Sequence, residues 1–328
     1  MDEILYKNVS FIKRIRSFVF MKLQSTLFII CSFTLFIGGF SQNYVDLVKA
    51  THTQIPNAGF ENSEALNTPI TQSKILTSIP IKISDSLSFL TGVDYELHNL
   101  KLFPISEPVN LNIVTAKIGL NFKHNSRLSG TYILLPKMAS DFGHLKSSFQ
   151  MGAIALFKYK LNDQTKLVFG DYVNKEFFGI LNVPILGVYH KSKDKKTEVD
   201  IKFPIVGYGD YKIHKNLRVG ADFLMIVRTF DLAKNNMNDF YVHTSSNEFA
   251  AYLQFDLFKE SLVIKAKAVY STFDYAVYQD NDLTPFGTFG VYPGDERVRL
   301  NGKISNALGF KISAIYRFQL DSPTLVIH

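Results

Sequence analysis

Charged side chains recur at every second position in several long segments of this chain, a pattern that can line a water-filled interior. In the segment 304–320, apolar residues occupy most even positions, whereas the two charged residues fall on odd ones. A period of two places such residues on one face of a β-strand. The residues selected as candidates for a lumen-facing position are Lys117, Arg218, Asp222, Arg228, Glu248, Lys265, Lys267, Lys311 and Arg317.

These inward candidates are compatible with two roles that the sequence leaves open. In an open barrel they would line an aqueous path for small solutes. In a closed barrel they would pair with one another and fill the lumen with side chains. Positive and negative residues are mixed, so the set favours neither anions nor cations. The same alternation assigns further charged residues to this face, namely Asp94, Glu96, Lys158, Asp200 and Lys202.

Two groups of serine and histidine residues raise a third alternative, a lipid hydrolase. They are the run 243–246 (His-Thr-Ser-Ser) and His144 with Ser140 or Ser147. A nucleophile needs a base within hydrogen-bond reach and a third group that orients the base. The spacing reveals no such third group, so the chain is predicted to have no catalytic residues and not to be an enzyme.

Metal, cofactor and nucleic-acid sites are not expected either. The acidic run 280–282 (Asp-Asn-Asp) lacks the Gly and the later Glu of a calcium loop, and the eight histidines are scattered along the chain. The sequence has no glycine-rich phosphate-binding loop and no HExxH motif. A net charge of +7 over 328 residues is too small to indicate a nucleic acid as partner.

The elements that would position these residues are long alternating strands. Short polar turns are predicted at 84–86, 124–126, 162–164, 214–216 and 259–261, and longer connections at 55–71, 99–109, 232–245 and 280–302. Long strands joined alternately by short turns and longer loops are typical of membrane barrels. A water-soluble β-sandwich is the alternative, but its strands would be shorter. The predicted fold is an all-β, antiparallel, up-and-down transmembrane β-barrel.

The number of strands depends on two segments. Residues 182–190 form either a strand or a loop, and 197–213 form either one strand or two strands that break at Pro204. Bacterial single-chain barrels usually have an even number of strands, which leaves about 12 or 14. The Pro-Ile-Leu-Gly run at 184–187 is echoed by Pro-Ile-Val-Gly at 204–207, and this echo favours the break and hence the larger number.

The N-terminal part has the features of a secretory signal peptide. An apolar run at 26–40 follows Met21-Lys22 and leads to small residues at the positions that signal peptidase requires before Gln42. We therefore expect an N-terminal extension and signal peptide over 1–41, cleavage after Ser41, and a single outer-membrane β-barrel domain over 42–328. Cleavage would also remove Cys31, the only cysteine, so the mature chain would contain no disulfide.

With these features the chain resembles the uncharacterised outer-membrane β-barrel families of Bacteroidota, notably one known only as a domain of unknown function. It is also similar in style to the barrel family associated with phenol meta-pathway degradation. The resemblance rests on the signal peptide, the Pro-Ile-x-Gly strand openings and the turn segment 211–220, and it covers most of 42–320. It implies a barrel in the cell outer membrane and supplies no catalytic residues.

We therefore expect an outer-membrane barrel that acts as a passive channel for small solutes. The alternatives are a non-conducting structural or adhesion barrel that acts through its outer loops, and an outer-membrane lipid hydrolase. The expected partners are outer-membrane lipid, the barrel-assembly machinery and small solutes, with no cofactor.

Overall fold

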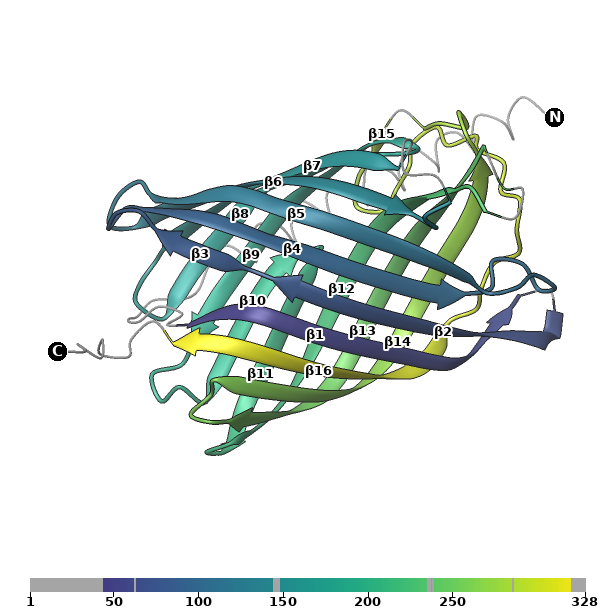
Figure 1. Cartoon of the computed structure of the whole chain (residues 1–328). Helices are drawn as coiled ribbons and strands as arrows, with labels where there is room; N and C mark the ends of the chain where they lie inside the picture. Colours follow the sequence, from purple (N-terminus) through teal and green to yellow (C-terminus); the bar gives the residue numbers. More distant parts are fainter. Residues whose placement is uncertain are drawn as a thin grey trace, which may run out of the picture. The chain divides into compact units, whose positions relative to one another are not determined.

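The computed structural model describes residues 44–61, 63–143, 148–234, 237, 239–284 and 286–319. The predicted signal peptide, its cleavage site, His144 and Ser147 lie outside these residues. Across the described ranges the regular elements are all strands, which join in one sheet that closes into an antiparallel barrel (Figure 1). The predicted all-β, up-and-down fold is confirmed. No helix in this part of the chain has the length and apolar character that a membrane crossing requires.

The strands alternate in direction around the barrel and differ widely in length. In chain order they are β1 (Tyr44–Phe60), β2 (Ser63–Thr77), β3 (Ile79–Lys82), β4 (Leu87–Leu100), β5 (Val109–Lys123), β6 (Leu128–Ser140), β7 (Phe149–Lys160), β8 (Thr165–Glu176), β9 (Gly179–Lys191), β10 (Thr197–Phe203), β11 (Val206–His214), β12 (Leu217–Leu232), β13 (Phe240–Leu257), β14 (Leu262–Gln279), β15 (Phe286–Gly287) and β16 (Ala307–Gln319).

In the described part of the chain, these segments make a wall of 14 strands. β3 continues the line of β2 along β4, and the two-residue β15 only pairs with the start of β9. The ring closes where β1 pairs with β16, from Tyr44 opposite Gln319 to Gln54 opposite Phe310. The prediction of 14 strands is confirmed, because 182–190 lie within β9 and 197–213 break at Pro204 into β10 and β11.

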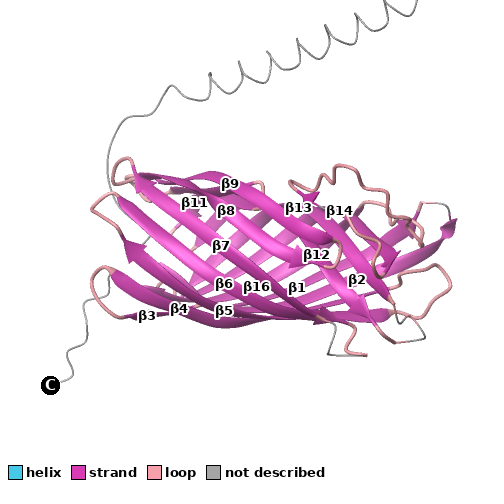
Figure 2. Ribbon diagram, turned by 90° about the horizontal axis from the view of Figure 1, so that it is seen from above, coloured by secondary structure: helices cyan, strands magenta, loops and turns pink. Residues whose placement is uncertain are grey.

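The two ends of the barrel differ in their connections. All five predicted tight turns occur at one end, here called the turn end, together with a sixth at 192–196 (Figure 2). The opposite end, here called the loop end, carries the longer connections 101–108, 141–148, 233–239 and 280–306.

Two expectations about the loop end are wrong. The predicted connection at 55–71 is mostly strand, because β1 runs on to Phe60 and β2 begins at Ser63. Tight turns are also not confined to the turn end, because 177–178 and 204–205 join their strands directly at the loop end. Pro204 has no N–H to donate to a neighbouring strand, so it ends β10 early and keeps the β10–β11 hairpin short.

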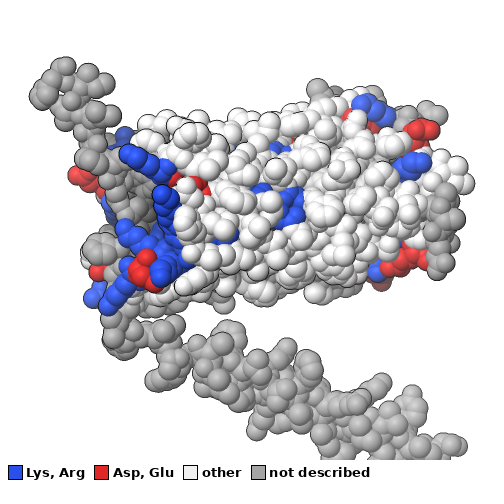
Figure 3. Space-filling view, turned by 90° about the horizontal axis from the view of Figure 1, so that it is seen from below, with Lys and Arg blue, Asp and Glu red and all other residues white. Residues whose placement is uncertain are grey.

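The wall has an apolar outer face and a mixed inner face. On β16, Phe310 and Ile312 are 71% and 56% exposed, whereas Lys311 and Ser313 between and beside them are buried. On the side of the barrel seen in Figure 3, most charged residues gather at the two ends, and the wall between them is largely uncharged. The alternation seen in the sequence therefore separates an outer surface from a lumen.

The lumen is divided along its length. Its loop-side half is filled by a cluster of buried residues, here called the apolar plug, which comprises Ile55, Ala58, Phe60, Ile70, Leu100, Leu102, Leu111, Ile113, Ala139, Phe230, Leu232, Val242, Phe273, Tyr275, Val277, Ile304 and Ala307. On the same side, β6 reaches across to β12, where the Asp141 N–H donates to the Asp231 carbonyl at 3.1 Å. The polar and charged inward residues lie mostly in the turn-side half.

Candidate functional site

A cavity of about 450 Å³ occupies the turn-side half of the lumen. Its wall is built from β1, β2 and β4 on one side and from β9–β14 and β16 on the other, and Glu260 places its edge at the β13–β14 turn. Nine basic and nine acidic residues line it, so the total charge is balanced and only the arrangement of charges can create a preference.

The structure brings most of the sequence-predicted residues to this cavity. Lys117 does not line it, because its Nζ lies 2.8 Å from Asp94 Oδ1 and donates to the Thr77 carbonyl at 3.0 Å. These contacts hold the Lys117 side chain against the β2–β4 part of the wall. The predicted residues on the cavity wall are Arg218, Asp222, Arg228, Glu248, Lys265, Lys267, Lys311 and Arg317.

Most of the charged residues around the cavity are paired. Arg218 contacts two carboxylates, Asp210 at 2.7 Å and Asp256 at 3.3 Å. Such pairing offsets the large cost of removing an isolated charge from water. The further pairs are Lys267 with Asp222, Lys311 with Glu248, Arg317 with Asp46, Lys191 with Glu198, and both Lys74 and Arg228 with Glu96.

Two lysines on the cavity wall, Lys49 and Lys265, have neither an acidic partner nor a hydrogen bond among the described residues. Lys265 is only 9% exposed, and its Nζ lies 4.3 Å from the ring centroid of Tyr252 and 5.1 Å from that of Tyr208. The faces of aromatic rings attract a cation. Sequence reasoning missed Lys49, because a β-bulge between Asp46 and Val48 shifts the alternation at the start of β1.

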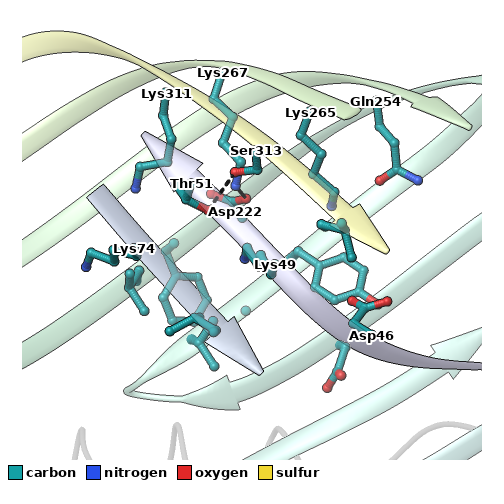
Figure 4. A pocket seen from close by; sticks show the side chains of 18 of the residues that line it. Asp46, Lys49, Thr51, Lys74, Asp222, Gln254, Lys265, Lys267, Lys311 and Ser313 are labelled. Carbon is teal, nitrogen blue, oxygen red and sulfur yellow. Dashed lines mark hydrogen bonds and ion pairs between the residues drawn. The ribbon is translucent and has the colours of Figure 1, made fainter. Parts of the chain in front are cut away.

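The strand register sets the lysines side by side. One row across the sheet runs from Lys74 on β2 through Thr51 and Ser313 to Lys265 on β14, and Lys267 pairs with Lys311 in the next row. The Thr51 and Ser313 hydroxyls lie 3.0 Å apart at the centre of the first row. Figure 4 shows the lysine side chains extending into the cavity around these two hydroxyls.

A second buried group of charges lies toward the loop end, between β6, β8 and β12. Lys137 Nζ lies 2.8 Å from Glu176 Oε1, and the two side chains are 4% and 0% exposed. The other carboxylate oxygen of Glu176 accepts hydrogen bonds from the Thr229 N–H and hydroxyl. The sequence did not predict this group, since it depends on the close approach of β6 to β12.

Arg297 fastens the segment 286–300 to the loop end of the barrel. Its guanidinium contacts both carboxylate oxygens of Asp295 at 2.8 Å and donates to the Tyr241 hydroxyl at 3.1 Å. It also stacks 4.3 Å from the ring centroid of Tyr278. The hydrogen bond from Arg297 holds the pKa of Asp295 below its ordinary value.

Replacing Arg297 by Ala is expected to release this segment while leaving the barrel closed. Hydrogen bonds with charged partners contribute about 1.5–3 kcal/mol, so amide protection in 286–300 should fall by roughly 10-fold or more in hydrogen-exchange experiments. Asp295 lies in the same segment and orients the Arg297 guanidinium toward Tyr241 and Tyr278 on the barrel. In the wild type the Asp295–Arg297 contact is present above the ordinary carboxyl pKa and is lost as the pH falls through the lowered pKa of Asp295. Protection should therefore stay constant down to about pH 4 and decline below it. Equal protection in the variant would show that Arg297 does not hold the segment.

The serine and histidine groups do not form a catalytic site in the part of the chain that the structure describes. The His243 ring nitrogens contact the Tyr292 hydroxyl at 3.0 Å and the Arg297 guanidinium at 3.3 Å, not a serine. The Ser140 hydroxyl accepts a hydrogen bond from the Phe142 N–H. Within the same described ranges, no group of three His, Cys, Asp or Glu side chains is placed to hold a metal ion.

No protein-family model matches the chain, and no curated protein matches it. Solved structures with a similar fold include an outer membrane channel from Pseudomonas putida F1 (7% identity, TM-score 0.40, covering 87% of this chain and 97% of that chain). Others are the NanC porin (10%, 0.36, 82% and 98%) and the Pseudomonas putida toluene transporter TodX (10%, 0.34, 84% and 90%). At such identities and TM-scores, the likeness is one of fold alone.

Proposed function

We propose that this chain spans the outer membrane as a β-barrel, with outer-membrane lipid and the barrel-assembly machinery as partners. Closure of the sheet pairs the backbone polar groups of the wall, which a hydrocarbon environment demands. Large apolar side chains cover the outer face, among them Ile118, Leu134, Leu186, Phe249, Leu253, Phe255, Phe310 and Ile312.

An aromatic cluster on the outer wall supports the same proposal. Phe157 stacks on Phe169 with ring centroids 5.4 Å apart, and Tyr132 meets Phe157 edge-on at 5.7 Å. All three pack on the outer faces of β6, β7 and β8 near the turn end. Aromatic girdles mark the interfaces of membrane barrels with water.

Placing an arginine on the outer face should impair assembly, whereas the neighbouring inward position should accept it. Leu253→Arg exposes a charge to lipid and is expected to cost about 2–4 kcal/mol. Gln254→Arg points inward, where the present Gln254 amide already donates to Asp256 at 2.6 Å, so the new charge would meet a carboxylate and should cost less than Leu253→Arg. The fraction of folded protein on unheated gels and the urea midpoint in lipid would measure both. Equal losses for the two variants would contradict a lipid-facing outer wall.

We propose further that the lumen passes small solutes and that the form described here is closed on the loop side. The observation that carries this proposal is the cavity of about 450 Å³, whose wall holds two unpaired lysines. A buried cation without an acidic partner requires water or a ligand around it. A cavity that must hold water or a ligand around its lysines favours transit of solutes over a purely structural interior.

Swelling of proteoliposomes in a small sugar such as arabinose tests the passage. Wild-type protein is expected to admit the sugar faster than protein-free vesicles, and a variant with a loosened plug should admit it faster still. Absence of influx with both proteins would overturn the proposal.

The second candidate is a non-conducting structural or adhesion barrel that acts through its outer loops. The apolar plug favours it, because a packed apolar cluster excludes water and ions. Absence of influx in the same vesicles would leave this candidate standing. For neither candidate do we propose an enzymatic role.

We also propose that the chain is exported by a signal peptide cleaved after Ser41 and that it belongs with the outer-membrane barrels of Bacteroidota. The family proposal rests on the Pro-Ile-x-Gly runs of the sequence, whose glycines flank β10 on both sides. A Cβ on Gly187 would lie 1.9 Å from the Ile201 carbonyl oxygen, so the strands can approach there only with glycine. N-terminal sequencing of the membrane-extracted protein tests the cleavage, for which Gln42 is the expected first residue.

A further inference from the structure

The positive charges of the cavity are concentrated in one part of its wall. Lys49, Lys265, Lys267 and Lys311 lie on β1, β14 and β16, and only Lys267 and Lys311 have carboxylate partners, one each. The cluster therefore keeps two lysines more than it has acids. Toward the turn end the balance is reversed, because Arg218 is shared between Asp210 and Asp256.

Of the two unpaired lysines, Lys265 is held in place by aromatic rings. Lys265 is packed between the rings of Tyr208 and Tyr252, at 5.1 and 4.3 Å, and is more than nine-tenths buried. Its ammonium group points into the cavity, on the same side as Lys49 (Figure 4). Next to it, the Thr51 and Ser313 hydroxyls share one hydrogen bond, so the hydroxyl that accepts in this pair keeps its own O–H free to donate to an anionic oxygen.

Another part of the cavity wall is apolar. It is formed by the β10–β11 turn and the neighbouring stretch of β12, through Ile205, Val206, Leu224 and Ile226. Such a surface is unfavourable for a small, fully hydrated ion and favourable for a hydrocarbon group. The cavity thus offers a cationic surface and an apolar surface to the same ligand.

We propose that this cavity binds a small amphipathic carboxylate, with the carboxylate among Lys49, Lys265, Thr51 and Ser313 and the hydrocarbon tail against the β11–β12 wall. This proposal names the class of solute that would pass through the lumen, and in that sense it rests on the proposed function. Binding is nevertheless measurable on the detergent-solubilised barrel without any transport, so the two proposals can fail separately.

Calorimetric titration of the full barrel in a zwitterionic detergent, with empty micelles as blank, tests the site with three matched probes. Hexanoate carries both the charge and the tail, hexanamide lacks the charge, and acetate lacks the tail. Hexanoate is expected to bind saturably and about 10-fold or more tightly than either of the others, since each of those loses one of the two contacts. Acetate binding as tightly as hexanoate would reject the apolar subsite.

Lysine variants locate the site within the barrel. Lys265→Gln and Lys49→Gln should each weaken hexanoate binding about 10-fold, whereas Lys265→Arg should retain most of it. Lys158→Gln is the control. Lys158 lies opposite the buried Val168 and so is on the inner face of the wall, but it does not line this cavity. Circular dichroism and gel mobility would verify that each variant is folded. The proposal would be overturned if the wild type showed no saturable hexanoate binding. It would also be overturned if the folded Lys265→Gln and Lys49→Gln variants bound hexanoate as tightly as the wild type does.

Discussion

Replacing Lys137 by Met is expected to lower the free energy of unfolding by about 3–5 kcal/mol, the typical cost of leaving a buried charge without its partner. Glu176, whose side chain is 0% exposed, would lose its contact with Lys137 at 2.8 Å. Its remaining hydrogen bonds come from neutral groups such as Thr229. Because these residues join β6, β8 and β12, the loss should loosen the loop end as a whole.

Urea-induced unfolding of the lipid-embedded barrel would measure this effect. Lys82→Met is the matched control, because Lys82 and Asp85 form a pair at 2.6 Å with side chains 71% and 97% exposed. Exposed pairs of this kind contribute little to stability, because water and salt screen the two charges. Similar losses in the two variants would show that Glu176 finds solvent or another partner when Lys137 is removed.

The second large effect is expected in the apolar plug. Changing Phe230 and Ile304 together to Ser should turn a barrel with little ionic current into one that conducts in clear single-channel steps. Both residues are fully buried in the plug, and apolar constrictions exclude ions by excluding water. Hydroxyl groups and the vacated volume would let water through, at a combined cost in stability of about 5–10 kcal/mol for the two truncations.

Planar-bilayer recordings at fixed protein density would compare the double variant with the wild type and with Phe249→Ser. Phe249 is 46% exposed on the outer wall, so its replacement removes an aromatic ring without touching the lumen. It should leave the current unchanged. Unaltered current in a folded Phe230→Ser and Ile304→Ser variant would mean that the lumen is closed by something other than the plug.

The sequence predicted the barrel well because alternation is a local property of each strand. On β14, a period of two placed Lys265 and Lys267 on one face, and both line the cavity. The break at Pro204 followed from the chemistry of proline and settled the strand number. Tight turns at the turn end were visible as short polar runs between apolar alternations.

The plug and the ion pairs could not be predicted in the same way. Further along β14, the inward positions change from lysine to Phe273, Tyr275 and Val277, while Asp274 faces outward with its side chain 40% exposed. Alternation defines the two faces of a strand, but it does not predict which side chains from other strands the inner face contacts at each position along the barrel axis. The pairs depend on the register between strands distant in sequence, as Lys311 with Glu248 illustrates.

The length of β13 and β14 has a consequence for how an antibody would recognise the loop end of the barrel. Each has 18 residues, which at a rise of about 3.3 Å and a tilt of about 40° gives a height of roughly 45 Å, against an apolar band of about 25 Å. In a bilayer, the excess of roughly 20 Å would extend the strand-built wall beyond the hydrocarbon, with the apolar plug as its core on the loop side. An antibody raised against the native protein would then bind discontinuous epitopes across neighbouring strands, and peptides copied from single loops would compete poorly for it.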